Sequence, residues 1–233
     1  MGAEFYEANY TEVFLKVVCH TMRFQIKNLQ GTLMHRGLLS LLLLIFLQIS
    51  LQGAHISQQK KILAFGDSIT YGYGANPDQS YPAQLAKLAN KEVINAGVPG
   101  ENSTQGLERL KKLLKSRNDI KIMILCHGAN DILHNASHTR LYENIKKMIK
   151  IAKAKDIKVL LLGVVNFQTN NLQTLPLYKK IAKEEDVAYN GDIIKIIEAK
   201  PSLKSDHVHP NAEGYAVMAE NIYASLRKAN LLK

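Results

Sequence analysis

From residue 61 onward, the sequence predicts a three-layer α/β sandwich, in which helices cover both faces of a parallel β-sheet. Two observations lead to this fold class. Short apolar runs rich in Ile, Val and Leu are typical of parallel strands that are buried on both faces. They alternate with longer amphipathic stretches at helical spacing, and this βαβα succession favours crossovers that return to one sheet.

Four apolar runs are the predicted strands. They span residues 62–65, 93–96, 120–126 and 157–165. Their near-continuous hydrophobicity indicates burial beneath helices on both sides of the sheet.

Five amphipathic stretches are the predicted helices. They span residues 81–90, 104–116, 141–155, 175–185 and 211–228. A chain of this size buries roughly 70% of its unfolded surface, which is enough for one self-sufficient core. We therefore expect residues 55–233 to form a single domain.

The N-terminal quarter differs in character from the rest of the chain. Residues 38–51 form an apolar run that is shorter than the roughly 20 residues needed to span a bilayer. Because Met34 and one basic residue precede this run and small residues follow it, we interpret residues 34–54 as a signal peptide, with a membrane anchor as the alternative. Residues 1–33 are an unassigned extension, for which a start codon placed too far upstream is the favoured explanation.

The composition is that of an ordinary globular protein, with 46% hydrophobic residues, 21% charged residues and a formal net charge of +10. The first 54 residues contain four basic and three acidic side chains, so residues 55–233 carry most of the positive charge. The lysines have the spacing of solvated helix faces without interleaved aromatic residues, which argues against nucleic-acid binding. The positive electrostatic potential of a basic protein favours loose association with an anionic membrane surface or an acidic substrate. Two cysteines, Cys19 and Cys126, are too few for a disulfide framework.

Four polar or glycine-rich motifs lie where a parallel sheet binds its ligands, at the carboxyl ends of its strands. Three follow predicted strands: GDSIT at 66–70, NAGVPG at 95–100 and GAND at 128–131. The fourth, DHVHP at 206–210, precedes the last predicted helix. We expect these motifs to meet at one edge of the sheet.

Ser68, Asp206 and His209 have the chemistry of a nucleophile, an orienting carboxylate and a base. A serine hydroxyl is a poor nucleophile until a base takes its proton, and a carboxylate fixes the tautomer of that base. The three-residue separation of Asp206 and His209 allows one turn to carry both. His207 is the alternative base, but adjacent side chains in a turn point apart. We favour His209, which Pro210 restricts to an extended conformation.

An oxyanion formed by attack of Ser68 needs preorganised hydrogen-bond donors. The candidates are the Ser68 amide, a glycine amide within residues 95–100 and the side-chain amide of Asn130. Gly97 and Gly100 both fit the glycine role, because a missing side chain permits close approach.

We expect neither a metal nor an organic cofactor. His134 and His138, with Asp131 nearby, are weak evidence for zinc without a cysteine or an H-E-x-x-H arrangement. The glycine-rich patterns of phosphate-binding and dinucleotide-binding loops are also absent after the first predicted strand.

With these four motifs in this order, residues 61–228 resemble the SGNH hydrolases, also called the GDSL family. The likeness is greatest to the bacterial periplasmic group of arylesterases, acyl-CoA thioesterases and lysophospholipases. It implies a flavodoxin-like sandwich without metal or organic cofactor. It also implies the site residues: Ser68, Asp206 and His209 as the catalytic triad, and Ser68, Gly100 and Asn130 as the oxyanion-hole donors.

Two departures from the family pattern stand close to these residues. Ile69 occupies a position where Leu is common, and Cys126 and His127 precede Gly128, where relatives often carry other residues. We expect His127 either to pack in the core or to support the catalytic residues from behind, without a catalytic role of its own.

The expected function is hydrolysis of a carboxylic ester or thioester through an acyl-enzyme on Ser68, in the periplasm or outside the cell. The alternatives are a carbohydrate acetylesterase of the same family and a non-catalytic lipid-binding or glycan-binding module, because a fold does not fix a substrate. The segment 166–174 carries no charge. We expect it to border an apolar acyl site with an uncharged polar rim, the alternative being a plain surface connection.

Overall fold

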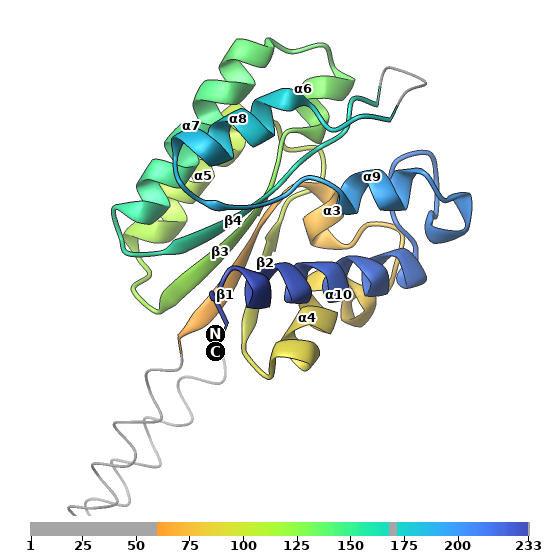
Figure 1. Cartoon of the computed structure of the whole chain (residues 1–233), viewed down its shortest axis with the longest axis horizontal. Helices are drawn as coiled ribbons and strands as arrows, with labels where there is room; N and C mark the ends of the chain where they lie inside the picture. Colours follow the sequence, from red (N-terminus) through yellow and green to blue (C-terminus); the bar gives the residue numbers. More distant parts are fainter. Residues whose placement is uncertain (1–59, 168–171, 233) are drawn as a thin grey trace, which may run out of the picture. The chain divides into compact units, whose positions relative to one another are not determined.

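Within residues 60–167 and 172–232, which the computed structural model describes, five parallel strands form one sheet (Figure 1). Their order is β2-β1-β3-β4-β5, with a switch in direction at β1 and β3 that is typical of flavodoxin-like folds. The strand bounds are β1 Lys61–Gly66, β2 Val93–Gly97, β3 Ile120–Cys126, β4 Lys158–Leu162 and β5 Ala188–Asn190.

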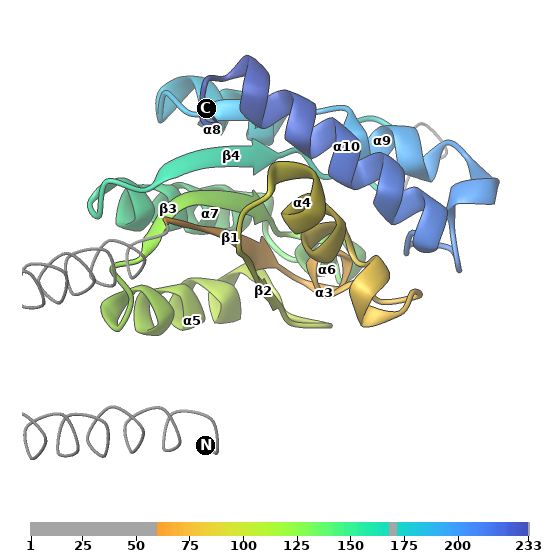
Figure 2. The same cartoon turned by 90° about the horizontal axis from the view of Figure 1, so that it is seen from below.

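Helices cover both faces of this sheet (Figure 1 and Figure 2). The first face packs against α5 (Ser103–Lys115), α7 (His138–Lys153) and α8 (Pro176–Glu184), and the second against α4 (Tyr81–Ala89), α9 (Ile193–Glu198) and α10 (Ala212–Lys228). Two short helices, α3 (Ser68–Tyr71) and α6 (Ala129–Leu133), follow β1 and β3. Two 3₁₀ turns, Pro77–Gln79 and Pro201–Leu203, complete the connections.

Alternate residues of β1 face the two helical layers. Leu63 and Phe65 belong to the core beneath α5, α7 and α8, whereas Ile62 and Ala64 belong to the core beneath α4, α9 and α10. All four side chains are fully buried. The predicted three-layer sandwich with a parallel sheet is therefore confirmed.

The predicted run 157–165 extends beyond the strand that it contains. β4 ends at Leu162, because the next residues leave the parallel sheet. Val164 O accepts a hydrogen bond from Leu175 N, and Val165 forms an isolated antiparallel bridge with Thr174. β5 and α9 were not predicted from the sequence.

The predicted signal peptide or anchor at 34–54 and the extension at 1–33 lie outside the described residues. In the ranges that the structure does describe, no helix has both the length and the hydrophobicity to cross a membrane. The described residues belong to one unit that spans residues 59–233.

Candidate active site

Ser68 is the first residue of α3, directly after β1 and the N-cap residue Asp67. The Asp67 carboxylate accepts a hydrogen bond from Ile69 N at 3.2 Å, which fixes this turn. Gly66 is required before it, because a Cβ there would come within 2.1 Å of the Cys126 carbonyl oxygen. The chain therefore turns sharply at the carboxyl edge of the sheet and presents Ser68 there.

Two hydrogen bonds join the three predicted triad residues. Ser68 Oγ lies 2.9 Å from His209 Nε2, and His209 Nδ1 lies 2.7 Å from Asp206 Oδ2. In this arrangement the Nδ1–H donates to the carboxylate, and Nε2 accepts from the serine hydroxyl. His207, the alternative base, is exposed, and its carbonyl oxygen accepts a hydrogen bond from Lys204 Nζ at 3.1 Å.

The loop that carries Asp206 also determines its charge state. Asp206 Oδ1 accepts hydrogen bonds from Val208 N and His209 N, each at 2.8 Å. Burial favours the neutral carboxyl, but these bonds and the His209 ring outweigh burial and lower the pKa of Asp206 to about 2. The carboxylate beside the imidazole is therefore ionised at neutral pH. The Tyr73 ring also lies against the His209 ring, with centroids 4.5 Å apart.

The two candidate glycines have different roles in the backbone. Gly100 has a φ of +75°, which L side chains rarely adopt. Gly97 instead allows close packing, because a Cβ there would come within 2.0 Å of Tyr71 N. Its N–H donates to Asn95 Oδ1 at 3.0 Å. Within residues 60–167 and 172–232, neither Gly100 N nor Ser68 N donates a hydrogen bond, so both remain available to a substrate.

Asn130 is the second residue of α6, which follows β3 after His127 and Gly128. Its Nδ2 donates to the Glu101 carbonyl oxygen at 3.0 Å, and the second N–H of the same amide is not needed for that bond. This hydrogen bond links Asn130 to the loop that carries Gly100. The convergence of Ser68 N, Gly100 N and Asn130 Nδ2 on one oxyanion remains a prediction.

Sequence reasoning missed Glu101 and Arg109, whose side chains contact each other next to these donors. Glu101 forms an ion pair with Arg109 at 2.6 Å and lies 3.1 Å from His127 Nε2. His127 is fully buried, which fits the expected role of a packing or supporting residue. The position of Glu101 next to Gly100 could have drawn attention to it. Its partners could not be predicted, because only the fold brings them into contact with it.

Two of the three residues considered for zinc, Asp131 and His134, have other contacts. Both carboxylate oxygens of Asp131 accept hydrogen bonds from Ser103, from its N at 2.7 Å and from its Oγ at 2.6 Å. His134 Nδ1 lies 2.7 Å from the Asn130 carbonyl oxygen. Among the residues described, no three His, Cys, Asp or Glu side chains cluster so as to bind a metal ion.

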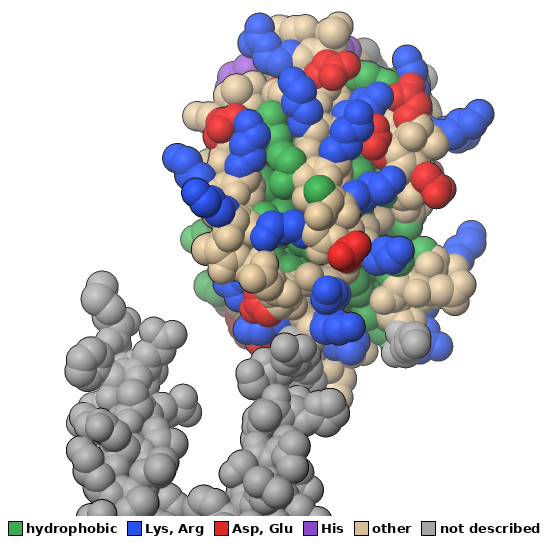
Figure 3. Space-filling model, turned by 90° about the vertical axis from the view of Figure 1, so that its left-hand side faces the viewer, with side chains coloured by type: hydrophobic (Ala, Val, Ile, Leu, Met, Phe, Trp, Pro, Cys, Tyr) green, Lys and Arg blue, Asp and Glu red, His purple; other side chains and the backbone are tan. Residues whose placement is uncertain are grey.

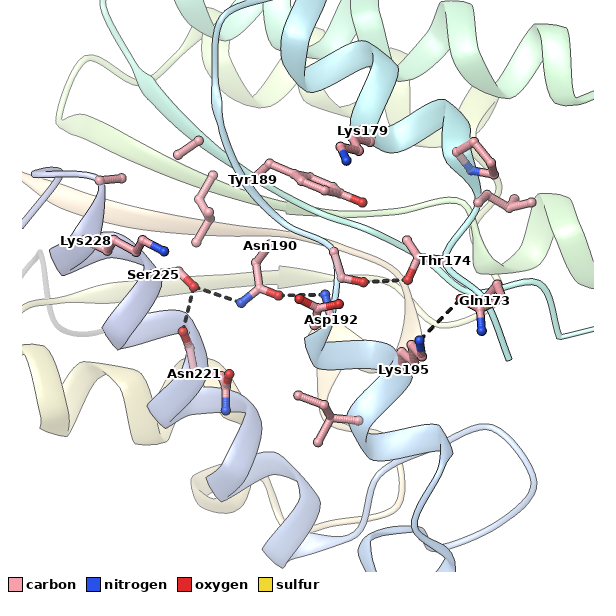
Figure 4. Close-up of a pocket in the computed structure, with 17 residues that line it drawn as sticks. Gln173, Thr174, Lys179, Tyr189, Asn190, Asp192, Lys195, Asn221, Ser225 and Lys228 are labelled. Atoms are coloured by element: carbon pink, nitrogen blue, oxygen red, sulfur yellow. Dashed lines mark hydrogen bonds between the residues drawn. The ribbon is translucent and has the colours of Figure 1, made fainter. Parts of the chain in front are cut away.

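A cavity of about 940 Å³ lies along β5, between α8, α9 and α10 (Figure 4). Gln173 and Thr174, from the uncharged segment predicted to border an acyl site, contribute to its lining. The remaining labelled side chains are polar or charged: Lys179, Tyr189, Asn190, Asp192, Lys195, Asn221, Ser225 and Lys228. Ser68 and His209 do not line this cavity, so it is separate from the candidate active site.

Comparison with known proteins agrees with this geometry. Residues 64–217 match the GDSL-like lipase/acylhydrolase family. The chain is 29% identical over 166 residues to thioesterase 1/protease 1/lysophospholipase L1 of Escherichia coli strain K12, covering 68% of this chain and 79% of that protein. It is 28% identical over 201 residues to an arylesterase of Vibrio mimicus, covering 82% and 98% respectively. The crystal structure of TesA shares the fold, with a TM-score of 0.65 at 24% identity over 72% of this chain and 99% of that one. The chain belongs to the GDSL-like lipase/acylhydrolase family, as the resemblance to SGNH hydrolases predicted.

Proposed function

We propose that this ester hydrolase cleaves carboxylic esters or thioesters through an acyl-enzyme on Ser68. The observation that carries the proposal is the hydrogen-bonded chain from Ser68 Oγ through His209 to Asp206, at 2.9 and 2.7 Å. A nucleophile, a base and an orienting carboxylate at these distances form the arrangement that activates a serine hydroxyl.

In the proposed mechanism, His209 Nε2 takes the proton of Ser68 Oγ while the oxygen attacks the acyl carbon. The ionised Asp206 stabilises the resulting imidazolium, and Ser68 N, Gly100 N and Asn130 Nδ2 donate to the oxyanion. Collapse of the tetrahedral adduct breaks the C–O or C–S bond, and His209 returns the proton to the leaving alcohol or thiol. Water then attacks the acyl-enzyme, with His209 again as base, and releases the acid.

Exposed apolar side chains near the proposed catalytic residues favour an acyl substrate. Tyr71 and Tyr73 follow Ser68 and are 52% and 51% exposed, whereas most large apolar side chains of the described chain are buried. Val98 precedes Gly100, and Leu133 follows Asn130; each is 38% exposed. Hydrophobic side chains that stay in water beside a site supply contact area for an apolar ligand. We therefore propose that the acyl chain of an aryl ester, thioester or lysophospholipid binds here.

The test is hydrolysis of a p-nitrophenyl ester series, from acetyl to palmitoyl, by the purified protein and by Ser68→Ala. We expect the wild type to prefer acyl chains longer than acetyl, and Ser68→Ala to be inactive and unlabelled by a fluorophosphonate. Preference for acetyl would instead indicate the acetylesterase alternative. Equal background rates with both proteins, and no labelling of the wild type, would contradict the proposed serine mechanism and favour a binding module.

We also propose that the protein acts in the periplasm or after secretion, because residues 38–51 resemble the apolar core of a signal peptide.

The distribution of charge supports a second proposal, loose attachment to anionic lipid surfaces. Lys and Arg side chains spread over the side of the molecule in Figure 3, with fewer acidic side chains among them. The exposed lysines of α5 and α7 are Lys111, Lys112, Lys115, Lys147, Lys150 and Lys153.

Sedimentation with lipid vesicles tests this attachment. We expect binding to vesicles that contain phosphatidylglycerol at low salt and release at high salt, because salt screens interactions between exposed charges. Equal binding to purely zwitterionic vesicles would contradict an electrostatic attachment.

A further inference from the structure

Three buried or half-buried side chains, Glu101, Arg109 and His127, form a cluster beneath the proposed active site. Arg109 makes two parallel hydrogen bonds to the Glu101 carboxylate, from Nε at 2.7 Å and from Nη2 at 2.6 Å. His127 Nε2 lies 3.1 Å from Glu101 Oε2. We call this group the Arg109 cluster.

Arg109 binds the ends of the two strands that precede the proposed nucleophile and glycine donor. Its Nη2 donates to Gly66 O at 3.1 Å, two residues before Ser68. Its Nη1 donates to Ala96 O at 3.0 Å, on the strand that leads to Gly100. The guanidinium also lies 4.1 Å from the centroid of the Phe65 ring, which fixes its plane. One side chain thus sets the spacing of the carboxyl ends of β1 and β2.

Through Glu101, the Arg109 cluster also contacts the segment after β3 that carries Asn130. Glu101 follows Gly100 directly, and its carbonyl oxygen accepts the hydrogen bond from Asn130 Nδ2. Its carboxylate is held by Arg109 and by His127, the residue that directly follows β3 and lies three residues before Asn130. Gly100 and Asn130, two of the three proposed oxyanion donors, are therefore attached to one residue, whose side chain is held by Arg109 and His127.

The packing around His127 leaves little freedom in the cluster. A Cβ on Gly106 would come within 2.2 Å of His127 Nε2, so α5 lies directly against the ring. In the described part of the chain, His127 Nδ1 is buried without a hydrogen-bond partner, which is unfavourable for stability. Replacing a buried ion pair with well-packed apolar residues is often neutral or stabilising. Stability alone does not explain this cluster.

We infer that the Arg109 cluster is a positioning unit, which holds Ser68, Gly100 and Asn130 in the relative geometry that the oxyanion transition state requires. The inference rests on the proposed function of these three residues. Glu101, Arg109 and His127 do not touch the reacting atoms in this scheme. Their effect is on the orientation of groups that do.

Glu101→Gln tests the inference, because it keeps the size of the side chain and removes the charge that Arg109 and His127 contact. We expect kcat for a p-nitrophenyl ester to fall about 10- to 100-fold while KM changes less than about threefold, since small misplacement of a catalytic group costs up to about 100-fold in rate. Affinity for an alkylboronic acid, which forms a tetrahedral adduct with Ser68, should fall in parallel with kcat.

Glu108→Gln is the matched control. Glu108 is exposed on α5 and pairs with Lys111 at 2.6 Å, so the same chemical change there should leave kcat and KM at the wild-type values. Arg109→Lys is the second test variant, because it keeps the charge but loses the planar fork that contacts Glu101, Gly66 and Ala96 together. It should show the same selective loss of kcat.

Circular dichroism shows which variants are folded. Wild-type kcat and boronate affinity in a folded Glu101→Gln or Arg109→Lys variant would overturn the inference, whatever the change in thermal stability. Ser68→Ala separates this failure from failure of the proposed function. If Ser68→Ala is inactive while Glu101→Gln is fully active, only the positioning inference is wrong; if Ser68→Ala retains activity, the proposed function and the inference both fail.

Discussion

The Asp206 carboxylate accepts three hydrogen bonds from its own loop: from Val208 N, His209 N and His209 Nδ1. The ring of His209 therefore has its orientation and tautomer set before any substrate arrives. In the proposed mechanism, a base held in this way would lose little conformational freedom on taking the proton from Ser68. The short spacing in DHVHP makes this possible, because the carboxylate and the base share one turn.

At Asn130 we predict an effect on turnover with little effect on binding. Asn130→Ala removes one proposed oxyanion donor, so kcat should fall about 100- to 1,000-fold while KM stays close to the wild-type value. Steady-state hydrolysis of a p-nitrophenyl ester measures both constants. The control is Asn118→Ala, at an exposed position after α5. A kcat within about twofold of the wild type would remove Asn130 from the mechanism.

The proposed triad could be predicted from the sequence, whereas the Arg109 cluster could not. Asp206 and His209 lie within one short motif, and Ser68 follows a strongly apolar strand. The partners of Glu101 are Arg109, eight residues later, and His127, 26 residues later. Their contact depends on how α5 packs on β3, and no local pattern records that packing.

At the scale of elements, the start of α5 links the two loops that carry Gly100 and Asn130, two of the three proposed oxyanion donors. The side chain of its N-cap residue Asn102 accepts hydrogen bonds from Thr104 N and Gln105 N, each at 3.0 Å, and Asn102 N donates to Gln105 Oε1 at 3.1 Å. The Asp131 carboxylate then binds Ser103 N at the first turn. The start of α5 is thereby attached to α6, and Gly100 and Asn130 lie on either side of this attachment.

The close approach of α5 to His127 leads to a prediction about stability. Gly106→Ala should destabilise the protein by about 1–2 kcal/mol, because overpacking costs about 1–3 kcal/mol and Ala recovers up to about 1 kcal/mol as the better helix former. Urea unfolding followed by circular dichroism measures this, since the protein contains no tryptophan for fluorescence. Lys112→Ala, on the exposed side of α5, should be nearly neutral. A neutral or stabilising effect of Gly106→Ala would show that the ring can move aside.

The elements that sequence reasoning missed are short, and the one strand boundary that it misplaced is set by tertiary contacts. β5 has three residues, all half-buried, and so is too short to show a period. α9 has the sequence IIKIIE over six residues, which also fits a strand. The bounds of the longer helices were predicted within a few residues, because their apolar stripes and caps are local features. The end of β4 was not, since the returning segment at Thr174 and Leu175 determines it.

At the scale of the whole molecule, strand order determines where the site forms. β1 lies between the edge strand β2 and β3, so these three neighbouring parallel strands end side by side at the carboxyl edge of the sheet. Ser68 follows β1, Gly100 follows β2 and Asn130 follows β3. The loop with Asp206 and His209 directly precedes α10, and α10 packs against α4 on one face of the sheet.

The stability of the whole fold should depend on pH through Glu101. Burial favours its neutral form, but the hydrogen bonds from His127 and Arg109, together with the Arg109 charge, lower the pKa of Glu101 to about 2. An unfolded Glu has a pKa of about 4.3, so between these values the unfolded chain binds more protons than the folded one. The stabilisation is complete above the unfolded pKa and is lost as the pH falls through the folded pKa.

Comparing the wild type with Glu101→Gln isolates this contribution. Burial raises the pKa of Asp67 and of Glu198, and these groups act in the opposite direction, so the pH dependence of one protein mixes several carboxyls. The difference in free energy of unfolding between the two proteins should include about 3 kcal/mol from the ionised carboxylate at pH 7 and lose that part near pH 2. Urea unfolding across this range measures the difference. A difference that does not change with pH would mean that the charge of Glu101 contributes nothing to the stability of the fold, and that Arg109 and His127 bind its side chain as well when it is neutral.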